Sequence, residues 1–217
     1  MTYDYDIWPI FQAAVRGDVP VLRYLEALRF QDGIYPSNFV KMRCVENHDQ
    51  ARIMALAPTR ARALAWTAFA AFNRGAFLVY GGQESEAAHT PSLFDVDPVA
   101  WRDYPLQPFV ARLAALKKDP AQVDGTFRLL AAEPAALAAW VHPGESLCGI
   151  FNVAGGTGRV DVPLPDGEYA DALTGAAVAV RGGATALPEA AAILRVAAPL
   201  DRVPVVPTLL DYQVEAG

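Results

Sequence analysis

The chain has 217 residues, of which 53% are hydrophobic and 19% are charged, so it can bury an apolar core and is unlike a disordered tail. Its 18 basic and 24 acidic residues give a net charge of -6 at neutral pH. This acidic balance argues against nucleic acid or an anionic membrane surface as the main partner, because both require a basic footprint.

The N-terminal third of the chain contains the pattern of a helix followed by a strand. Asp18 is a predicted N-cap for a helix whose apolar residues recur at helical spacing over 21–28 and which ends at Asp32-Gly33. Residues 39–45 (FVKMRCV) have the length and propensity of a strand, although Lys41 and Arg43 are charged.

Residues 59–118 repeat this alternation. Thr59 is a predicted cap for a second helix, whose apolar and aromatic residues continue at helical spacing to Phe72 and are expected to face the core. A short apolar run at 76–80 (AFLVY) predicts a strand buried on both faces, and a third helix is expected over about 106–118. Strands and helices that alternate at this spacing are typical of βαβ units with a parallel sheet.

The pattern changes after Lys118. Short runs with strand propensity are separated by turn residues every eight to twelve positions, which predicts an all-β antiparallel sandwich, and only the Ala-rich stretch 134–140 keeps helical periodicity. Residues 1–118 have a net charge of +1 and residues 119–217 of -7, which supports two domains with these bounds. The expected strands lie at 146–153, 159–164, 176–180, 192–197 and 203–206.

The cysteines and the termini bear on the compartment. Cys44 and Cys148 lie in apolar runs far apart, so buried free thiols in a reducing compartment are the simplest prediction, with a single bridge as the alternative. The chain starts with an acidic, aromatic segment instead of a basic and apolar leader, and its longest apolar stretch is too short to span a bilayer. We therefore expect a soluble, cytoplasmic protein.

The most polar segment follows the predicted strand 39–45. Residues 46–52 (ENHDQAR) combine two carboxylates, two amides, an imidazole and a guanidinium. In a parallel α/β barrel the catalytic groups lie on the loops after the C-terminal ends of the strands, where this segment would be. The alternative is a hydrogen-bonded connection that caps the next helix.

The segment CVENHDQAR resembles the fourth conserved region of the alpha-amylase superfamily of glycoside hydrolases, F-x-x-x-H-D, at the end of the seventh barrel strand. Four further segments resemble that family in the same order: 3–11 around the sixth strand, 77–84 (FLVYGGQE) at the eighth, 89–101 after it, and the helix that ends at Lys118. The β-rich tail is similar in position and size to the family's C-terminal domain. The resemblance implies a partial (β/α)8 TIM barrel, of about strands 6–8 with their helices, followed by the sandwich.

The resemblance also assigns roles to the polar residues. Asp49 is similar to the family's third acidic residue, which binds sugar hydroxyls and stabilises the transition state without acting as nucleophile or proton donor. His48 resembles the imidazole that donates to the same sugar, and Arg52 would orient a neighbouring carboxylate. The candidate substrate-binding residues are His48, Asn47, Glu46, Arg52, Gln83 and Glu84.

Two departures from the family are visible. Cys44 stands where the family has phenylalanine, which should loosen packing beneath the loop. The motif G-x-R-x-D, which contains the nucleophile, is absent, as are the general acid and the D-x-x-x-N-H motif of the third strand. The resemblance therefore implies a fragment that is inactive alone and needs the N-terminal half of the barrel or a second chain, with an α-glucan or maltooligosaccharide as ligand. The alternatives are a non-catalytic carbohydrate-binding or accessory protein and an unrelated α/β binding domain.

The remaining candidates favour structural roles. His89 and His142 are isolated and complete no zinc motif, Asp95 and Asp97 complete no calcium loop, and no metal or cofactor is expected. The glycine-rich stretch 155–158 joins two β-runs, which favours a hairpin turn over a phosphate-binding loop. Three aromatic residues have a position from which they could stack on sugar, with packing in the core favoured for each: Trp8, Trp101 and Tyr104.

Overall fold

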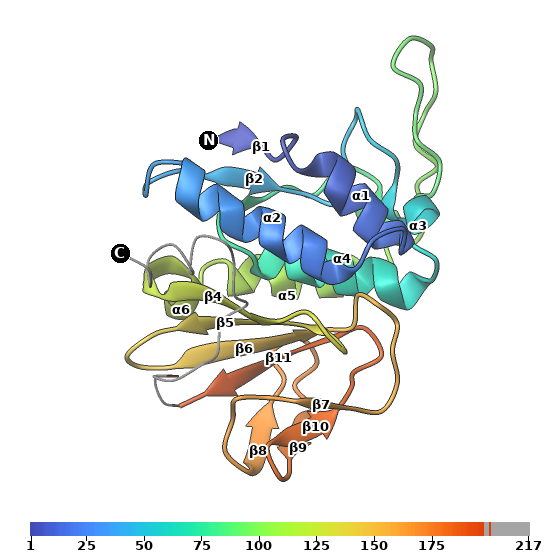
Figure 1. The fold of residues 1–217 in the computed structure, drawn as a ribbon. Coiled ribbons are helices and arrows are strands. Elements are labelled where there is room, and N and C mark those ends of the chain that lie inside the picture. Colours follow the sequence, from blue (N-terminus) through green and yellow to red (C-terminus); the bar gives the residue numbers. More distant parts are fainter. Residues whose placement is uncertain (198–199, 201–217) are drawn as a thin grey trace.

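The computed structural model describes residues 1–197 and residue 200, so the strand expected at 203–206 lies outside the described residues. An α/β part made from the first half of the chain lies above an antiparallel sheet made from the second half, with helices between them (Figure 1). Among the described residues no helix is long and apolar enough to cross a membrane.

The α/β part is built on three parallel strands. These are β1 (Thr2–Tyr3), β2 (Lys41–Arg43) and β3 (Ala76–Phe77), hydrogen-bonded in the order β1-β2-β3. β2 and β3 are shorter than the predicted 39–45 and 76–80, because each ladder contains only two residue pairs. Within the described residues, the outer edges of β1 and β3 are not paired with another strand.

Helices α1 (Trp8–Arg16) and α2 (Val21–Ile34) connect β1 to β2 and pack against each other. The predicted N-cap was wrong: Pro20 precedes α2 without a side-chain cap, and Asp18 accepts from Arg16 Nε at 2.7 Å instead. Gly17, at φ 88°, ends α1 in the left-handed region, where glycine has no steric cost.

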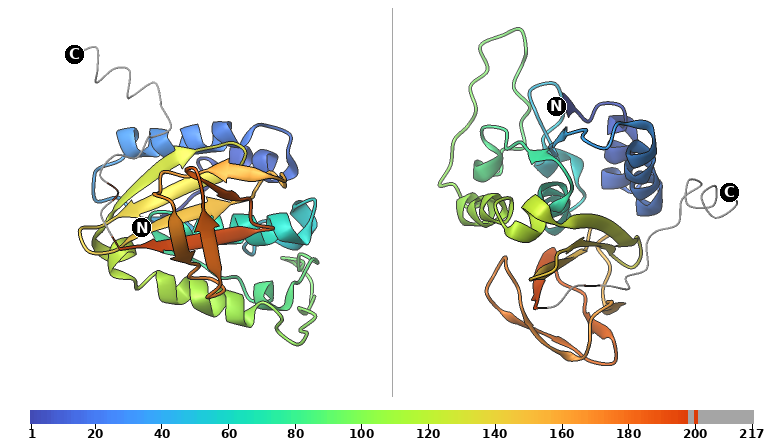
Figure 2. Two further views of the ribbon diagram at one scale, coloured as in Figure 1. Left: turned by 90° about the horizontal axis from the view of Figure 1, so that it is seen from below. Right: turned by 90° about the vertical axis from the view of Figure 1, so that its left-hand side faces the viewer.

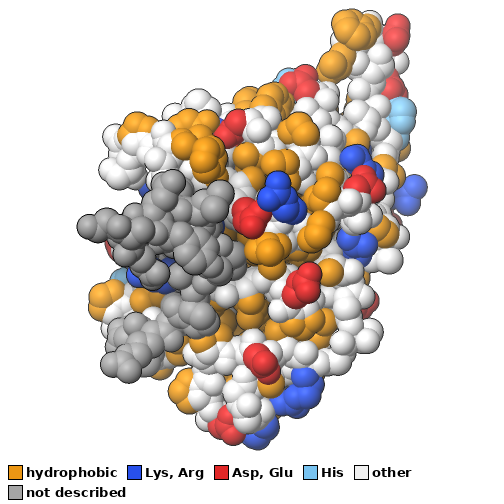
Figure 3. Space-filling view, in the orientation of Figure 1, with side chains coloured by type: hydrophobic (Ala, Val, Ile, Leu, Met, Phe, Trp, Pro, Cys, Tyr) orange, Lys and Arg blue, Asp and Glu red, His pale blue; other side chains and the backbone are white. Residues whose placement is uncertain are grey.

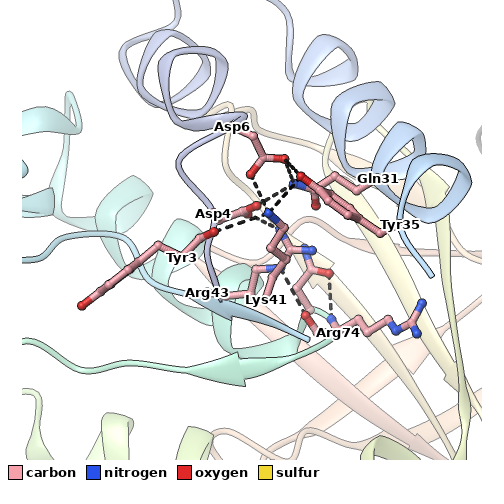
Figure 4. A network of polar contacts seen from close by, with 9 residues as sticks. Tyr3, Asp4, Asp6, Gln31, Tyr35, Lys41, Arg43 and Arg74 are labelled. Carbon is pink, nitrogen blue, oxygen red and sulfur yellow. Dashed lines mark hydrogen bonds and ion pairs between the residues drawn. The ribbon is translucent and has the colours of Figure 1, made fainter. Parts of the chain in front are cut away.

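The charges within β2 are paired beneath α2. Lys41 Nζ donates to Asp6 at 2.7 Å, and Arg43 forms an ion pair with Asp4 in which both side chains are almost fully buried. Gln31 from α2 donates to both aspartates, at 2.6 and 2.8 Å (Figure 4). Because buried charges require partners, this network explains how a strand with two basic residues can be covered by a helix.

Two elements connect β2 to β3, the short α3 (Ile53–Leu56) and α4 (Arg60–Phe72). The predicted cap of α4 is confirmed, since Thr59 accepts from Arg62 N at 3.2 Å. Gly75 lies between α4 and β3 at φ 105°, and a Cβ there would be 2.2 Å from the Lys41 carbonyl oxygen. Only glycine fits this crossing.

The second half begins with α5 (Gln107–Leu116), after the 3-10 turn η1 (Gln83–Ser85), and α6 (Pro120–Asp124). Four antiparallel strands follow in the order β11-β6-β5-β4: β4 (Thr126–Ala131), β5 (Ala136–Val141), β6 (Ser146–Phe151) and β11 (Ala191–Val196). The stretch 134–140 is therefore mainly strand, against its helical periodicity. Its side chains alternate between the two faces of a buried sheet, and that packing outweighs the helix propensity of alanine.

Two short strand pairs form a second layer against this sheet (Figure 2). They are β10-β7 and β8-β9, made from β7 (Arg159–Asp161), β8 (Gly167–Ala170), β9 (Ala177–Val180) and β10 (Ala184–Ala186). The expected hairpin at 155–158 is wrong, because β6 pairs with β5 and β11 while β7 pairs with β10. That segment crosses from one sheet to the other.

The four-stranded sheet is buried on both faces. One face packs on α4, where Trp140 Nε1 donates to the Phe72 carbonyl at 2.7 Å and the ring of Phe151 contacts that of Phe69. The opposite face packs on the second layer and includes Cys148, which is a free thiol like the buried Cys44. The α/β part and the sandwich are thus joined through α4, which packs against both β3 and β6.

Candidate functional site

The candidate site lies where β2 and β3 end. Because parallel strands end at the same edge of a sheet, the loop after β2, residues 44–52, and the loop after β3, residues 78–86, meet there. Arg52 joins them, since its Nη2 donates to the Gly81 carbonyl at 2.9 Å.

Asp49 and His48 are the exposed members of the first loop. The Asp49 side chain is 41% exposed and that of His48 is 54% exposed, with 3.4 Å between His48 Nε2 and Asp49 Oδ1. Tyr5, from the loop after β1, donates its hydroxyl to Asp49 Oδ2 at 2.8 Å. The Asp49 carboxylate is therefore held by the loop after β1 while it stays accessible to a ligand. The loops after β1, β2 and β3 together form the rim of the site.

Asn47 is buried behind this pair. Its Oδ1 accepts from the backbone N–H of Asp49 at 2.9 Å and from the Tyr5 hydroxyl at 3.3 Å, and its Nδ2 donates to Cys44 Sγ at 3.6 Å. These contacts fix the turn that presents Asp49. The buried Cys44 thus accepts a hydrogen bond from the loop that follows its strand.

Glu46 and Arg52 form an ion pair whose side chains are both 0% exposed. Arg52 Nη1 donates to Glu46 Oε1 at 2.7 Å, and Glu46 Oε2 accepts from the N–H of Ile53 at 2.7 Å, in the first turn of α3. The helix-capping alternative therefore describes Glu46, while Asp49 and His48 of the same loop take no part in the cap.

Arg52 is held on every side. Its Nε donates to the His89 carbonyl at 3.3 Å, and its guanidinium lies 4.1 Å from the centre of the Tyr80 ring. At Gly82, φ 97°, a Cβ would be 2.8 Å from Val99 and 3.2 Å from Arg52 Nη2. Gly82 thus lets the backbone approach the guanidinium closely.

Gln83 and Glu84 differ in accessibility. Gln83 is 2% exposed and its Nε2 lies 3.5 Å from Thr67 Oγ1 on α4, so it faces the helix layer. Glu84 is half-buried and its Oε2 accepts from Gly82 N at 3.1 Å. Of the residues expected to bind substrate, Glu46, Asn47, Arg52 and Gln83 are buried in this arrangement, and His48 and Glu84 are not.

The electrostatics separate the exposed and buried groups. Burial and the adjacent Asp49 carboxylate raise the pKa of Tyr5 to about 12, so the phenol remains a donor at any physiological pH. Burial raises the pKa of Glu46, while Arg52 acts in the opposite direction. Within the described part of the chain, no three His, Cys, Asp or Glu side chains are grouped so that they could hold a metal ion.

Sequence reasoning did not identify Tyr5 as part of the site. It belongs to the segment 3–11 that resembles the sixth-strand region, and the signal available was an aromatic residue placed just after a short strand. The aromatic candidates also divide: Trp8 is buried, as expected, but Trp101 and Tyr104 are 54% and 44% exposed.

Comparison with known proteins gives one family match. Residues 128–194 match the model of the bacterial alpha amylase C-terminal domain, which spans the strands from β4 to β11. No curated protein sequence matches the chain.

Solved structures extend the similarity to the α/β part. An alpha-amylase from Lactobacillus plantarum is 33% identical, with a TM-score of 0.81, over 90% of this chain and 47% of its own. The noncanonic maltogenic alpha-amylase AmyB from Thermotoga neapolitana is 22% identical, with a TM-score of 0.77, over 90% of this chain and 50% of its own. AmyP, in complex with maltose, is 17% identical, with a TM-score of 0.68, over 93% of this chain and 51% of its own. The last two show the fold alone, and this chain spans about half the length of each of the three.

Proposed function

Since this chain is a C-terminal portion of the alpha-amylase superfamily, we propose that it belongs to a glycoside hydrolase acting on α-glucosidic bonds. Residues 1–118 would form the last βα units of a (β/α)8 barrel, and the described residues from 119 onward its C-terminal sandwich domain. The observation that supports this best is Asp49. It is an exposed carboxylate after the middle strand of a parallel sheet, hydrogen-bonded to Tyr5 from the adjacent loop.

In this proposal Asp49 binds hydroxyl groups of the sugar whose bond is cleaved. Its hydrogen bonds strengthen as the ring flattens toward an oxocarbenium ion, which contributes to transition-state stabilisation. His48 donates to the same sugar and Glu84 borders the site. The buried residues act indirectly, as Glu46 and Arg52 fix the loop from below, Asn47 fixes its turn, and Gln83 anchors the second loop.

The nucleophile and the general acid would come from another polypeptide segment. The chain covers 47% of the Lactobacillus alpha-amylase, and the outer edges of β1 and β3 are unpaired within the described residues, so the N-terminal half of a barrel or a second chain could pair there. Retaining glycosidases need two carboxyl groups about 5–5.5 Å apart, and Asp49 supplies neither in this proposal.

Two measurements on the purified chain test this function. With a chromogenic α-glucoside we expect no turnover, and retaining hydrolysis that Asp49→Asn abolishes would contradict the proposal that the nucleophile and the general acid come from another polypeptide segment. With maltotriose we expect chemical-shift changes at His48 and Asp49 that Asp49→Asn removes. Asp95→Asn, on an exposed loop, is the matched control and should leave these changes intact. Binding of maltotriose that is indifferent to Asp49→Asn would refute the site.

A further inference from the structure

Residues 86–105 form neither helix nor strand and extend from the α/β part as a long arm (Figures 1 and 2). The arm has internal order. His89 Nε2 lies 2.7 Å from Asp97 Oδ2, and the same oxygen accepts from the N–H of Ser92 at 2.8 Å. Hydrophobic side chains gather at its far end (Figure 3). Phe94, near the middle of the arm in sequence, is 94% exposed.

The returning limb of the arm is attached to the rim of the site. The N–H of Leu106 donates to the Glu84 carbonyl at 3.0 Å, and the N–H of Arg102 to Ser85 Oγ at 3.4 Å. Trp101 lies over the loop after β3, since a Cβ on Gly81 would be 3.5 Å from Trp101 Cη2. Gly81 is also the residue whose carbonyl accepts from Arg52.

Trp101 and Tyr104 form an exposed aromatic pair on this limb. Their ring centres are 6.2 Å apart with an interplanar angle of 44°, and about half of each side chain is accessible. The other three tryptophans are buried, at 0–5% exposure. Tyr104 has φ 50°, in the left-handed region that a bulky side chain rarely adopts, and strained residues of this kind cluster at ligand-binding sites.

We propose that Trp101 and Tyr104 are a binding platform for a glucosyl unit of an α-glucan, beside the sugar bound by Asp49. This inference rests on the proposed function for the identity of the ligand. The C–H face of a pyranose ring is apolar and packs on the face of an aromatic ring, which removes both from water. The exposed Arg102 and Asp103, between the two aromatic residues in sequence, provide a cation and a carboxylate for the hydroxyl groups.

The contacts that connect this platform to the Asp49 loop are short. Trp101 contacts Gly81, Gly81 accepts from Arg52, and Arg52 pairs with Glu46, in the same loop as Asp49. The Arg52–Glu46 step is fully buried, so the limb that carries Trp101 is connected to the Asp49 loop through an ion pair held inside the protein. In this proposal a glucan chain of a few units contacts both Asp49 and the aromatic pair.

The test uses the single exposed tryptophan as its probe. Maltotriose should change the tryptophan emission of the purified chain and should protect one tryptophan from oxidation by N-bromosuccinimide. Cellotriose, the β-linked isomer, is the control ligand and should do so weakly. Trp101→Phe should remove the emission change, and Tyr104→Ala should weaken maltotriose binding about tenfold, the effect of about 1.4 kcal/mol. Tyr35→Phe, in the network beneath α2, is a matched control and should bind maltotriose normally.

The outcomes separate this proposal from the proposed function. If maltotriose shifts the Asp49 signals but leaves Trp101 unprotected, the platform is refuted and the Asp49 site stands. If Asp49→Asn abolishes the shifts at the loop while Trp101 still responds, the platform is supported independently. If Trp101 is already protected without sugar because the chain self-associates through the arm, the platform is refuted in favour of a protein interface.

Discussion

Individual residues of the loop after β2 contribute either to stability or to ligand contact. The buried set, Glu46 and Arg52, forms an ion pair. Both charges are removed from water, and hydrogen bonds within the protein replace those to water. The exposed set, His48 and Asp49, makes few contacts of its own, apart from the hydroxyl of Tyr5. The two sets lie within the seven residues 46–52, so substitutions at nearby positions should have different consequences.

Glu46→Ala should destabilise the fold strongly. It leaves the Arg52 guanidinium buried without its carboxylate and removes the acceptor of Ile53 N, for a loss of about 3–5 kcal/mol in the free energy of unfolding. Urea denaturation followed by circular dichroism measures it. Asp18→Ala removes the partner of Arg16 in an exposed pair and should cost at most about 1 kcal/mol. Equal losses in the two variants would contradict the burial argument.

Tyr5 should report on Asp49 through its own titration. The pKa of Tyr5 is raised to about 12, first by burial and then by the Asp49 carboxylate. Asp49→Asn removes the negative charge, so the pKa of Tyr5 should fall toward the ordinary value of about 10 and the tyrosinate should form at lower pH. The titration of Tyr5 can be followed by NMR with tyrosine-selective ¹³C labelling, and Tyr5→Phe assigns its signal. An unchanged titration would mean that the 2.8 Å contact does not persist in solution.

At this scale the sequence located the loop but did not distinguish its accessible residues. The polar residues after the predicted strand identified residues 46–52 as the site. A run of polar residues does not show, however, which side chains point inward and which point to solvent. The partners that decide the matter, such as Gly81 and Tyr5, lie at least 29 positions away. Trp101 shows the converse, because an aromatic residue was expected to pack and tertiary context leaves it exposed.

The connection between α4 and β3 depends on a close approach of two backbones. Gly75→Ala would bring a methyl group to 2.2 Å from the Lys41 carbonyl and also impose a positive φ on alanine, so it should destabilise by more than about 1 kcal/mol. Lys117 Nζ donates to the Gly75 carbonyl at 3.0 Å, which ties α5 to the same crossing.

Gly175→Ala is the matched control for this change. Gly175 also has a positive φ, 78°, but no atom lies within 4 Å of a Cβ built there. The difference in thermal unfolding between the two variants isolates the contact with Lys41 from the backbone strain they share. If both variants unfold at the same temperature, the crossing is looser than the structure indicates.

The elements themselves were predicted where local signals agree with packing. α4 combines a capping threonine with an apolar face, and both were visible in the sequence. β5 was missed because Ala136 and Ala138 face α4 while Leu137 and Ala139 face the second layer. In a sheet buried on both faces, polar and apolar residues do not alternate along a strand. The spacing of hydrophobic residues alone therefore cannot identify its strands.

The whole molecule has one sheet covered on both faces and one that is not. Lys41 and Arg43 of β2 pair beneath α2, whereas the neighbouring Val40 is 42% exposed and Val79, after β3, is 39% exposed. Because side chains alternate along a strand, Met42, between Lys41 and Arg43, points to the opposite face of β2, where it is only half-buried, and the exposed Val40 and Val79 adjoin the strand ends. Unpaired edges at β1 and β3 add hydrogen-bonding groups to this surface.

The exposed sheet leads us to expect self-association of the purified chain in the absence of a complementing polypeptide. Light scattering coupled to size-exclusion chromatography should give a mass that increases with concentration. Val79→Lys places a charge on the open surface and should lower that mass toward the monomer. Val123→Lys, on α6 and 61% exposed, changes charge equally at a site away from the sheet and should leave association unchanged. A folded monomer at every concentration, with wild type and Val79→Lys alike, would show that the parallel sheet needs no partner to stay folded.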